Sequence, residues 1–237
     1  MSSLNPFFQI FTKNRPFIDP DSSKWPKEWK EIRFKSYPRF KKIILPQPNL
    51  DEKFPLKKAI LERRSKRDFL DNALLDLQAL SNLLFYSAGI TEEGKFLRAY
   101  PSGGARYPLE MYVFLFKGRD IETGLFHYNV LKHNLEKILD KEVLKLKKSF
   151  QGTFIEKAEA VIVISSIEQR SFVKYGNLAY KLMLLEAGHL GQNVYLISEA
   201  IGLKCCALGD FNKNLVHTLL DIDGITETAF YALAIGH

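Results

Sequence analysis

The chain has 237 residues, of which 46% are hydrophobic and 13% aromatic, so it can bury a full core, and a disordered protein is excluded. Its formal charge of +7 at pH 7 can attract nucleic acid, anionic lipid or a phosphorylated small molecule. That charge is concentrated between Lys24 and Arg67, where fifteen lysines and arginines face five acidic residues, so the rest of the chain is slightly acidic.

The cysteines and the apolar stretches indicate the compartment. Cys205 and Cys206 are adjacent, and neighbouring residues rarely reach disulfide geometry, so a reducing compartment is expected. No apolar stretch approaches the ~20 residues that a bilayer requires, and no signal peptide is visible. We therefore expect a cytoplasmic protein that does not engage membranes.

Residues 1–50 are predicted to form an extended N-terminal arm. Seven of the ten prolines lie before residue 49, and prolines, lysines and aromatic residues alternate there without a helical or strand period. A disordered tail would be poor in aromatic residues. The arm is expected to lie across a domain of residues 51–237, held by its own aromatic side chains: Trp25, Trp29, Phe34, Tyr37 and Phe40.

Regular structure is predicted from Pro55 onward. A helix starts at this proline and ends near the basic residues 63–67. A second helix has Asp76 as its N-cap and ends at Gly89. Three segments rich in β-branched and aromatic residues are then predicted as strands, with a short helix at 140–150 between the last two. These strands span 109–118, 124–130 and 158–166.

The longest predicted helix spans 177–201. Apolar side chains occur on almost every face of it, so we expect it to be buried, either inside the domain or at a subunit interface. Strands at 203–211 and 228–236, around a short helix at 213–221, complete the chain. Because helices and strands mix without a βαβ rhythm, the sequence predicts an α+β fold.

Two motifs could carry chemistry. No phosphate-binding loop, dinucleotide-binding glycine motif, metal-spaced Cys/His set or nucleophile elbow occurs, so no metal site is expected. The segment RRSKR, residues 63–67, offers a serine hydroxyl and guanidinium forks that suit a phosphate monoester, although a solvated basic loop would also explain it. The adjacent glycines of PSGG, residues 101–104, allow backbone N–H groups to approach a ligand, or simply form a tight turn.

The order of the motifs adds a resemblance. RRSxRxF, a helix ending in AGI, PSGGARYPLE, LLEAGHLGQN and a late GxF together resemble the FMN-dependent nitroreductase superfamily. From Trp25 to the C-terminus the chain resembles more narrowly the SagB-type dehydrogenases, the azoline oxidase or McbC-like branch, which act in ribosomal peptide natural-product clusters. The resemblance implies a nitroreductase-like α+β fold, with a central, mainly antiparallel sheet flanked by helices and the long buried helix at a dimer interface.

The resemblance also implies FMN as the cofactor. The positions that match the family's phosphate-binding stretch are Arg63, Arg64, Ser65 and Arg67. Lys66 falls at the variable position of this stretch and is expected to face solvent. Many nitroreductases complete the phosphate pocket with a Lys/Arg pair at the C-terminus, whereas this chain ends in LAIGH.

Further cofactor contacts are implied from two other regions. In such enzymes the PSGG string contacts the flavin of the neighbouring subunit, which implies a homodimer with FMN sites shared between subunits. The residues concerned here are Pro101, Ser102, Gly103 and Gly104. Gln192, Leu208 and Gly209 match positions near the flavin ring or its tail.

A lysine–tyrosine pair before the long helix is typical of the azoline oxidase branch, where it is thought to deprotonate the substrate while hydride passes to flavin. Lys174 and Tyr175 are therefore the catalytic candidates. A lysine can act as a base only when burial or a nearby positive charge lowers its pKa towards neutrality. Two ordinary surface residues at a helix start would give the same pattern.

Three functions follow from these observations. The first is an FMN-dependent oxidoreductase that oxidises azoline rings in a modified peptide, with a peptide substrate or a modification complex as partner. The second keeps the fold but reduces nitro compounds or quinones with NAD(P)H. The third is a nucleic-acid-binding module in which the aromatic residues of the basic arm stack on bases, but packing of these residues on the domain explains them better.

Overall fold

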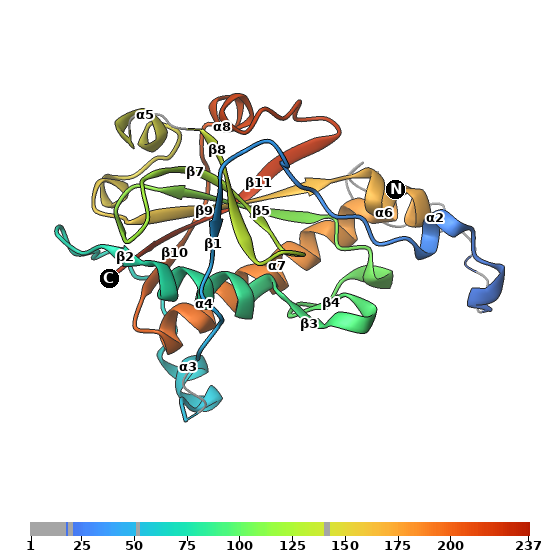
Figure 1. Cartoon of the computed structure of the whole chain (residues 1–237), viewed down its shortest axis with the longest axis horizontal. Coiled ribbons are helices and arrows are strands. Elements are labelled where there is room, and N and C mark those ends of the chain that lie inside the picture. Colours follow the sequence, from blue (N-terminus) through green and yellow to red (C-terminus); the bar gives the residue numbers. More distant parts are fainter. Residues whose placement is uncertain (1–17, 19–20, 51–52, 140–142) are drawn as a thin grey trace, which may run out of the picture.

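The computed structural model describes residues 18, 21–50, 53–139 and 143–237. Its centre is a seven-stranded sheet in the order β1-β8-β7-β5-β9-β11-β10, in which every neighbouring pair is antiparallel (Figure 1). The predicted α+β fold with a mainly antiparallel sheet is confirmed. The strands are β1 Lys42–Ile44, β5 Leu109–Leu115, β7 Gly124–Asn129, β8 Asn134–Leu139, β9 Ala160–Ile167, β10 Lys204–Leu208 and β11 Glu227–Gly236.

Helices cover both faces of this sheet. Helices α4 and α7 lie on one face, and α5 and α8 lie on the other (Figure 1). The helices are α2 Lys27–Lys30, α3 Leu56–Glu62, α4 Leu77–Ala88, α5 Val143–Lys147, α6 Gln169–Tyr175, α7 Leu178–Ala200 and α8 Lys213–Leu220. Short ladders pair β2 (Leu75–Asp76) with β6 (Gly118–Arg119) and β3 (Ile90–Glu92) with β4 (Leu97–Arg98). The 3₁₀ turns are η1 Ser22–Lys24, η2 Glu93–Lys95, η3 Gly103–Ala105 and η4 Thr153–Glu156.

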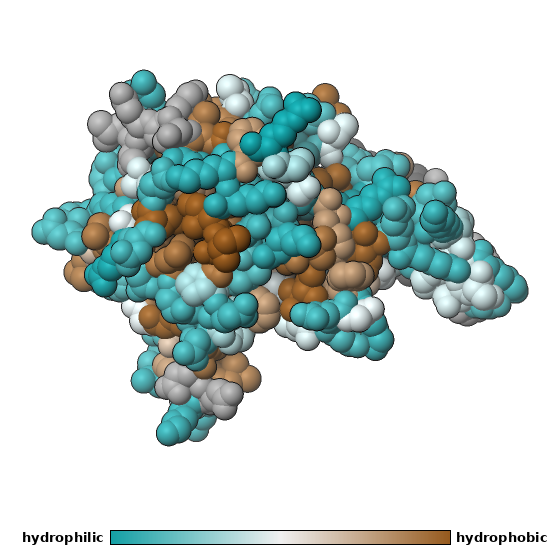
Figure 2. Space-filling model, viewed as in Figure 1, coloured by the Kyte–Doolittle hydropathy of each residue, from teal (hydrophilic) through white to brown (hydrophobic). Residues whose placement is uncertain are grey.

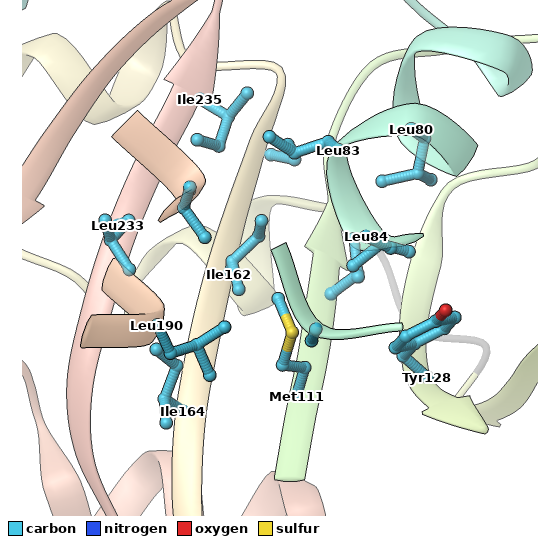
Figure 3. Packing of buried hydrophobic residues seen from close by; sticks show 14 of the residues in the cluster. Leu80, Leu83, Leu84, Met111, Tyr128, Ile162, Ile164, Leu190, Leu233 and Ile235 are labelled. Carbon is cyan, nitrogen blue, oxygen red and sulfur yellow. The ribbon is translucent and has the colours of Figure 1, made fainter. Parts of the chain in front are cut away.

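The main core lies between the sheet and helices α4 and α7. Alternate strand residues point to these helices because side chains alternate across a strand. Figure 3 shows Ile162 and Ile164 of β9 facing Leu190 of α7, with Leu83 of α4 beside them. Each such fully buried aliphatic side chain contributes ~1.5–3 kcal/mol. This packing holds α7 against the centre of the sheet, so residues along α7 have fixed positions.

The predicted helix ends are reproduced in α4. Asp76 caps its N-terminus by accepting a hydrogen bond from the Ala79 amide (2.7 Å), and Gly89 follows the last helical residue. The predicted strands 109–118, 124–130 and 158–166 correspond to β5, β7 and β9, each shifted or shortened at its ends. The short helix expected at 140–150 appears as α5, with residues 140–142 outside the described part of the chain.

Helix α6 differs from the expectation for this region. Lys174 and Tyr175 were expected just before or at the start of the long helix, but they form the last turn of a separate helix. Gly176, with φ of 49°, ends α6 in a conformation that glycine adopts readily, and α7 begins two residues later. The two candidate side chains therefore point away from the axis of α6, not of α7.

Buried ionic groups connect α6 to the second face of the sheet. The Nε2 and Nδ1 atoms of His127 lie 2.8 and 2.9 Å from carboxylate oxygens of Glu110 and Glu136. Because a carboxylate only accepts hydrogen bonds, both ring nitrogens donate and His127 is protonated. Burial opposes this charge, but the two carboxylates outweigh it and raise the pKa of His127. Glu110 also accepts a hydrogen bond from Arg170 of α6, so two positive and two negative groups balance.

The N-terminal arm lies along the sheet and adds strand β1 to its edge. Its contacts with the domain are specific: Lys35 donates to Glu227 of β11, and the Tyr37 amide donates to Glu136 of β8. The Phe34 ring lies edge-on to Phe96, with centroids 5.5 Å apart. The aromatic side chains of the arm thus contact the domain, and the division at residue 50 stays a prediction. Residues 1–17, 19 and 20 lie outside the described residues.

Nothing in the described part of the chain has the combination of helix length and apolar character that a membrane span needs.

Candidate functional site

The basic segment 63–67 runs beside the sheet. Ser65 forms a parallel bridge with Cys205 of the edge strand β10, and the Lys66 amide donates to the Cys205 carbonyl (3.0 Å). The Ser65 hydroxyl lies 3.0 Å from the hydroxyl of Tyr195, on α7. The guanidinium of Arg63 lies over the same tyrosine ring, 5.3 Å from its centroid. Strand-like pairing with β10 therefore presents Arg63 and Ser65 together on the side of α7.

Arg67 lines an adjoining cavity of about 340 Å³. This cavity is also lined by Phe154, Leu208, Gly209 and Asp210. Leu208 and Gly209 are two of the residues expected near the flavin, so the fold brings them together with one of the expected phosphate ligands. Arg67 also lies near Phe154, with its guanidinium carbon 5.8 Å from the ring centroid.

Two other basic residues of the segment point elsewhere. The Arg64 Nη1 atom donates to the carbonyls of Leu61 and Arg63 (2.9 and 2.7 Å), so its guanidinium is turned back onto its own chain. Lys66, which is expected to face solvent, is partly exposed and also has a partner on α7. Lys66 forms an ion pair with both carboxylate oxygens of Glu199 (3.0 and 2.9 Å) and ties the segment to the C-terminal end of α7.

The glycine loop is held by a buried acid. The Ser102 hydroxyl donates to Glu186 of α7 (2.8 Å) and accepts from the Tyr107 amide (2.8 Å). Burial of Glu186 raises the pKa of its carboxyl group to about 8. Its Oε1 atom has no partner among the described residues. Pro101 is exposed, and Gly103 packs on α7 so closely that a Cβ there would lie 3.1 Å from Leu182.

Lys174 and Tyr175 meet the glycine loop at Gly104. A Cβ atom on Gly104 would lie 2.2 Å from the Tyr175 hydroxyl and 3.0 Å from Lys174 Nζ. Gly104 also has φ of 61°, where side chains other than hydrogen are strained. Both facts explain why glycine occupies this position, and they place the two catalytic candidates directly against the loop.

Gly104→Ala is therefore expected to displace Lys174 and Tyr175 and to destabilise the protein by more than backbone strain alone, which is ~1 kcal/mol. Gly202→Ala is the matched control, because Gly202 has φ of 75° but no atom near its Cβ position. Urea unfolding of the two variants measures the difference. Equal losses of stability would show that Tyr175 and Lys174 do not pack against the loop.

The Lys174 amine is enclosed. The residue is 2% exposed, and its Nζ atom lies 3.5 Å from the centroid of the Trp25 ring and 5.9 Å from that of Trp29. Burial, and then the positive charge of Arg106, lower the pKa of Lys174, and no carboxylate in the described ranges pairs with it. Burial raises the pKa of Tyr175. Burial therefore shifts the pKa of each group in the direction that favours its uncharged form.

The basic segment and the glycine loop lie at opposite ends of α7 within one chain. Gly103 packs on Leu182, near the start of the helix, whereas Lys66 pairs with Glu199, near its end. At 1.5 Å per residue these points are roughly 25 Å apart along the helix. Gln192 lies between them on the exposed side of α7. A single chain thus forms three separate groups of candidate residues. Arg63 lies with Ser65, and Arg67 lies with Leu208 and Gly209. Gly104, Lys174 and Tyr175 lie together, apart from the first two groups.

Sequence reasoning missed three residues of these regions. Tyr195 contacts the basic segment, Glu186 holds the loop through Ser102, and Arg106 holds α6 and the arm. Arg106 could have been suspected, since it is a charged residue only two positions after the glycines. Tyr195 gives a weak signal, a hydroxyl-bearing side chain on the inner, apolar side of a long helix. Its partner is 130 positions away, which no local pattern reveals.

Residues 60–237 match the Nitroreductase family. The protein MJ1384 of Methanocaldococcus jannaschii, whose own description as a nitroreductase is provisional, is 34% identical over 178 residues, which are 74% of this chain and 88% of the relative. The chain therefore belongs to the nitroreductase family, and it is an oxidoreductase of the flavin-dependent type. The family expected from the motifs is confirmed.

Two further relatives belong to peptide natural-product pathways. The microcin B17-processing protein McbC of Escherichia coli is 27% identical over 163 residues, covering 66% of this chain and 60% of McbC. The trifolitoxin-processing protein TfxB of Rhizobium leguminosarum bv. trifolii is 29% identical over 177 residues, covering 68% of this chain and 47% of TfxB. The chain thus spans about half of the length of these two relatives, and the predicted resemblance to the McbC-like branch is confirmed.

Solved structures share the fold. The E. coli microcin synthetase McbBCD complex with truncated pro-MccB17 bound aligns with a TM-score of 0.66 at 22% identity, over 100% of this chain and 83% of that chain. A nitroreductase-type protein of Desulfovibrio desulfuricans in complex with FMN aligns with a TM-score of 0.52 at 22% identity, over 77% and 86% of the two chains. At these identities the likeness is one of fold, and the nitroreductase-like fold is confirmed.

Proposed function

We propose that the protein is an FMN-dependent dehydrogenase that oxidises azoline rings in a modified peptide. The observation that carries this proposal is the buried amine of Lys174 beside the Tyr175 hydroxyl and the Gly104 backbone. Oxidation of an azoline to an aromatic azole removes one proton and one hydride, so it needs a group that accepts a proton. The processing roles in the names of McbC and TfxB support the same class of substrate.

The residues of the basic segment and its neighbouring cavity fit FMN. Arg63, Ser65 and Arg67 offer guanidinium and hydroxyl donors for the phosphate oxygens. Leu208 and Gly209 line the cavity that Arg67 borders, so they would contact the tail or the ring. The bound flavin would supply a two-electron acceptor. The protein's part is to hold the phosphate and to place the glycine loop against the ring.

Lys174 is assigned as the base. Its neutral form would take the proton at Nζ, and enclosure of the amine favours that form because burial lowers its pKa. Tyr175, whose pKa burial raises, keeps its proton and would donate a hydrogen bond to charge that develops on the substrate. The pair lies in the last turn of α6, so one helix turn presents both groups to the same ligand.

A reductase of nitro compounds or quinones that uses NAD(P)H is the second candidate. The similarity to MJ1384 favours it, since that relative matches over more of its own length than McbC or TfxB. Such a reaction does not explain the enclosed lysine. Steady-state turnover with NAD(P)H and a quinone distinguishes the two functions, because a peptide dehydrogenase need not accept nicotinamide.

We further infer that the protein is a homodimer with shared FMN sites. The inner side of α7 is buried, but its outer side is exposed in the single chain, with Leu184 and Leu185 51% and 52% exposed. Exposed apolar residues also occur on α3, namely Leu56, Ile60 and Leu61, and Figure 2 shows apolar surface on this helix. Two α7 helices packed antiparallel about a two-fold axis would bring the glycine loop of one chain towards the basic segment of the other.

The double variant Leu184→Glu/Leu185→Glu is expected to be monomeric and to lose bound flavin, because two unpaired carboxylates would be buried at the interface. Light scattering coupled to gel filtration measures the mass, and the absorbance spectrum measures the flavin. Ile225→Glu is the matched control, since Ile225 is an exposed aliphatic residue in the loop before β11. A variant that stays dimeric would place the interface elsewhere.

The test of the proposed function uses the purified wild-type protein. It should be yellow and release FMN on denaturation. Mixed without oxygen with a peptide that contains one thiazoline or oxazoline, it should lose flavin absorbance while the peptide loses the mass of two hydrogen atoms. A flavin-containing protein that leaves the peptide unchanged but turns over NAD(P)H and a quinone would favour the second candidate.

A further inference from the structure

Two tryptophans of the N-terminal arm cover the candidate base. The Lys174 amine faces the Trp25 ring at 3.5 Å from its centroid, and Trp29 lies against Trp25 with ring centroids 6.3 Å apart. The indole nitrogen of Trp29 donates to the Val173 carbonyl of α6 (3.0 Å). The arm therefore contributes part of the surroundings of the amine, and the glycine loop and Tyr175 contribute another part.

Arg106 fastens this arm to α6. The residue is 3% exposed and its guanidinium donates to three backbone carbonyls: Nε to Arg170 of α6 (2.7 Å), Nη1 to Trp29 (2.7 Å) and Nη2 to Glu28 (2.9 Å). The planar fork of arginine suits such multiple donation, whereas lysine has a single point charge. Because all three acceptors are neutral carbonyls, none of them cancels the positive charge that Arg106 brings near Lys174.

We propose that Trp25, Trp29 and Arg106 are positioning residues for Lys174, and that the N-terminal arm is part of the active site. The two indoles fix the side chain of the lysine and exclude water from its amine, while Arg106 holds the arm, α6 and the glycine loop in one arrangement. This inference rests on the proposed function, in which Lys174 is the base. It adds that a segment outside the matched residues 60–237 shapes the reaction.

The charges around the amine determine the expected pH dependence. Tyr175 faces it from α6 and Arg106 from the loop, with Arg170 of α6 and Glu31 and Arg33 of the arm near Arg106. The Trp25 ring attracts an ammonium group and so favours the charged form. Burial acts in the opposite direction and is the larger effect, with Arg106 adding to it, so the pKa of Lys174 is lowered. Removing the arm's cover should therefore raise this pKa.

The experiment measures Lys174 without requiring turnover. Competitive trace acetylation of the full-length protein at a series of pH values, followed by mass spectrometry of the Lys174 peptide, gives the reactivity and the pKa of this amine. The variants are Trp25→Ala, Arg106→Gln and Arg106→Lys. Phe40→Ala is the control, because Phe40 is an aromatic residue of the same arm that packs on Tyr37 instead. Retained flavin and a cooperative thermal unfolding transition well above the assay temperature show that a variant is folded.

We expect the plateau reactivity of Lys174 to rise in Trp25→Ala and Arg106→Lys, because both variants uncover the amine. The pKa of Lys174 should rise towards the ordinary ~10.4 in Trp25→Ala and Arg106→Gln. A base must be unprotonated, so the rising limb of the rate of azoline oxidation should move to higher pH in the same variants. Each unit by which the pKa rises leaves tenfold less neutral amine at a fixed pH below the pKa. Arg106→Lys should not rescue the rate, since it keeps the charge but loses the fork.

Wild-type reactivity and pKa of Lys174 in Trp25→Ala and Arg106→Lys would overturn the proposal, whatever the activity. The proposal would also be overturned if the variants change the reactivity of Lys174 but oxidise azolines at the rate of the Phe40→Ala control. The arm would then cover Lys174 without affecting the reaction. A wild-type protein that binds FMN but oxidises no azoline peptide removes the proposed function instead. In that case the acetylation results still decide whether the arm encloses the amine.

Discussion

Replacing Arg63 and Ser65 together with alanine is expected to strip FMN from the purified protein. Hydrogen bonds to a charged phosphate contribute ~1.5–3 kcal/mol each. Losing one from each residue should weaken binding by about 3 kcal/mol or more, which is roughly 150-fold in Kd. Of the three proposed phosphate ligands, Arg63, Ser65 and Arg67, only Arg67 would remain. Titration of flavin fluorescence measures the affinity, and gel filtration shows whether the cofactor is retained.

Arg64→Ala is the matched control for this variant. Its guanidinium donates to the Leu61 and Arg63 carbonyls, so its removal should leave FMN affinity near that of the wild type. Although the motif places Arg64 among the phosphate ligands, its geometry separates it from Arg63 and Ser65. Wild-type affinity for FMN in the double variant would exclude the phosphate assignment. A loss in Arg64→Ala as large as in the double variant would show that the segment rearranges when the cofactor binds.

Lys174→Met is expected to lower kcat for azoline oxidation by about 10²- to 10⁴-fold, the usual contribution of a general base. Methionine fills similar space without leaving a buried polar group, so the protein should fold and keep its flavin. In the wild type the rate should rise with pH through the pKa of Lys174, because the amine must lose its proton first. Since that pKa is lowered, the rise is centred below ~10.4. The Lys174→Met variant should lack this rise of the rate with pH.

Three further variants separate the roles around this base. Lys174→Arg should not restore activity, because a guanidinium keeps its proton at any practical pH. Tyr175→Phe should cause a smaller loss, about fivefold for a neutral hydrogen bond of ~1 kcal/mol. Lys213→Met, at an exposed position on α8, should turn over like the wild type. Full activity in Lys174→Met with flavin bound would exclude the lysine as the base.

Local periodicity was enough to predict most of the fold. The apolar runs of β5 and β9 and the capped helix α4 are recognisable because burial on a strand or a helix imposes its own spacing on the side chains. Strand β8 was missed, since NLEKIL carries a charged residue on each face, Glu136 on one and Lys137 on the other. The structure explains the first: Glu136 faces buried His127, so a charged residue can occupy a core position when a partner from the next strand neutralises it.

The candidate site was only partly accessible from the sequence. The motifs identified Arg63, Ser65 and Gly104, because a phosphate needs clustered donors and a close backbone approach needs glycine. They could not separate Arg64 from Arg63, since the direction of a side chain depends on the carbonyls that the fold places near it. The motifs alone also did not place Lys174 and Tyr175 at the end of α6, although Gly176, directly after them, is a residue that often ends a helix.

The amino-acid sequence by itself determined the family, the α+β class and the residue types that suit a phosphorylated cofactor, because these depend on composition, spacing and short motifs. Only the tertiary structure decided which residues surround Lys174. Trp25 and Arg106 reach it from an arm and a loop far away in the chain, and their contacts follow from how α6, the loop and the arm pack together. Burial and nearby charge are properties of that packing, so the protonation of the amine is decided there as well.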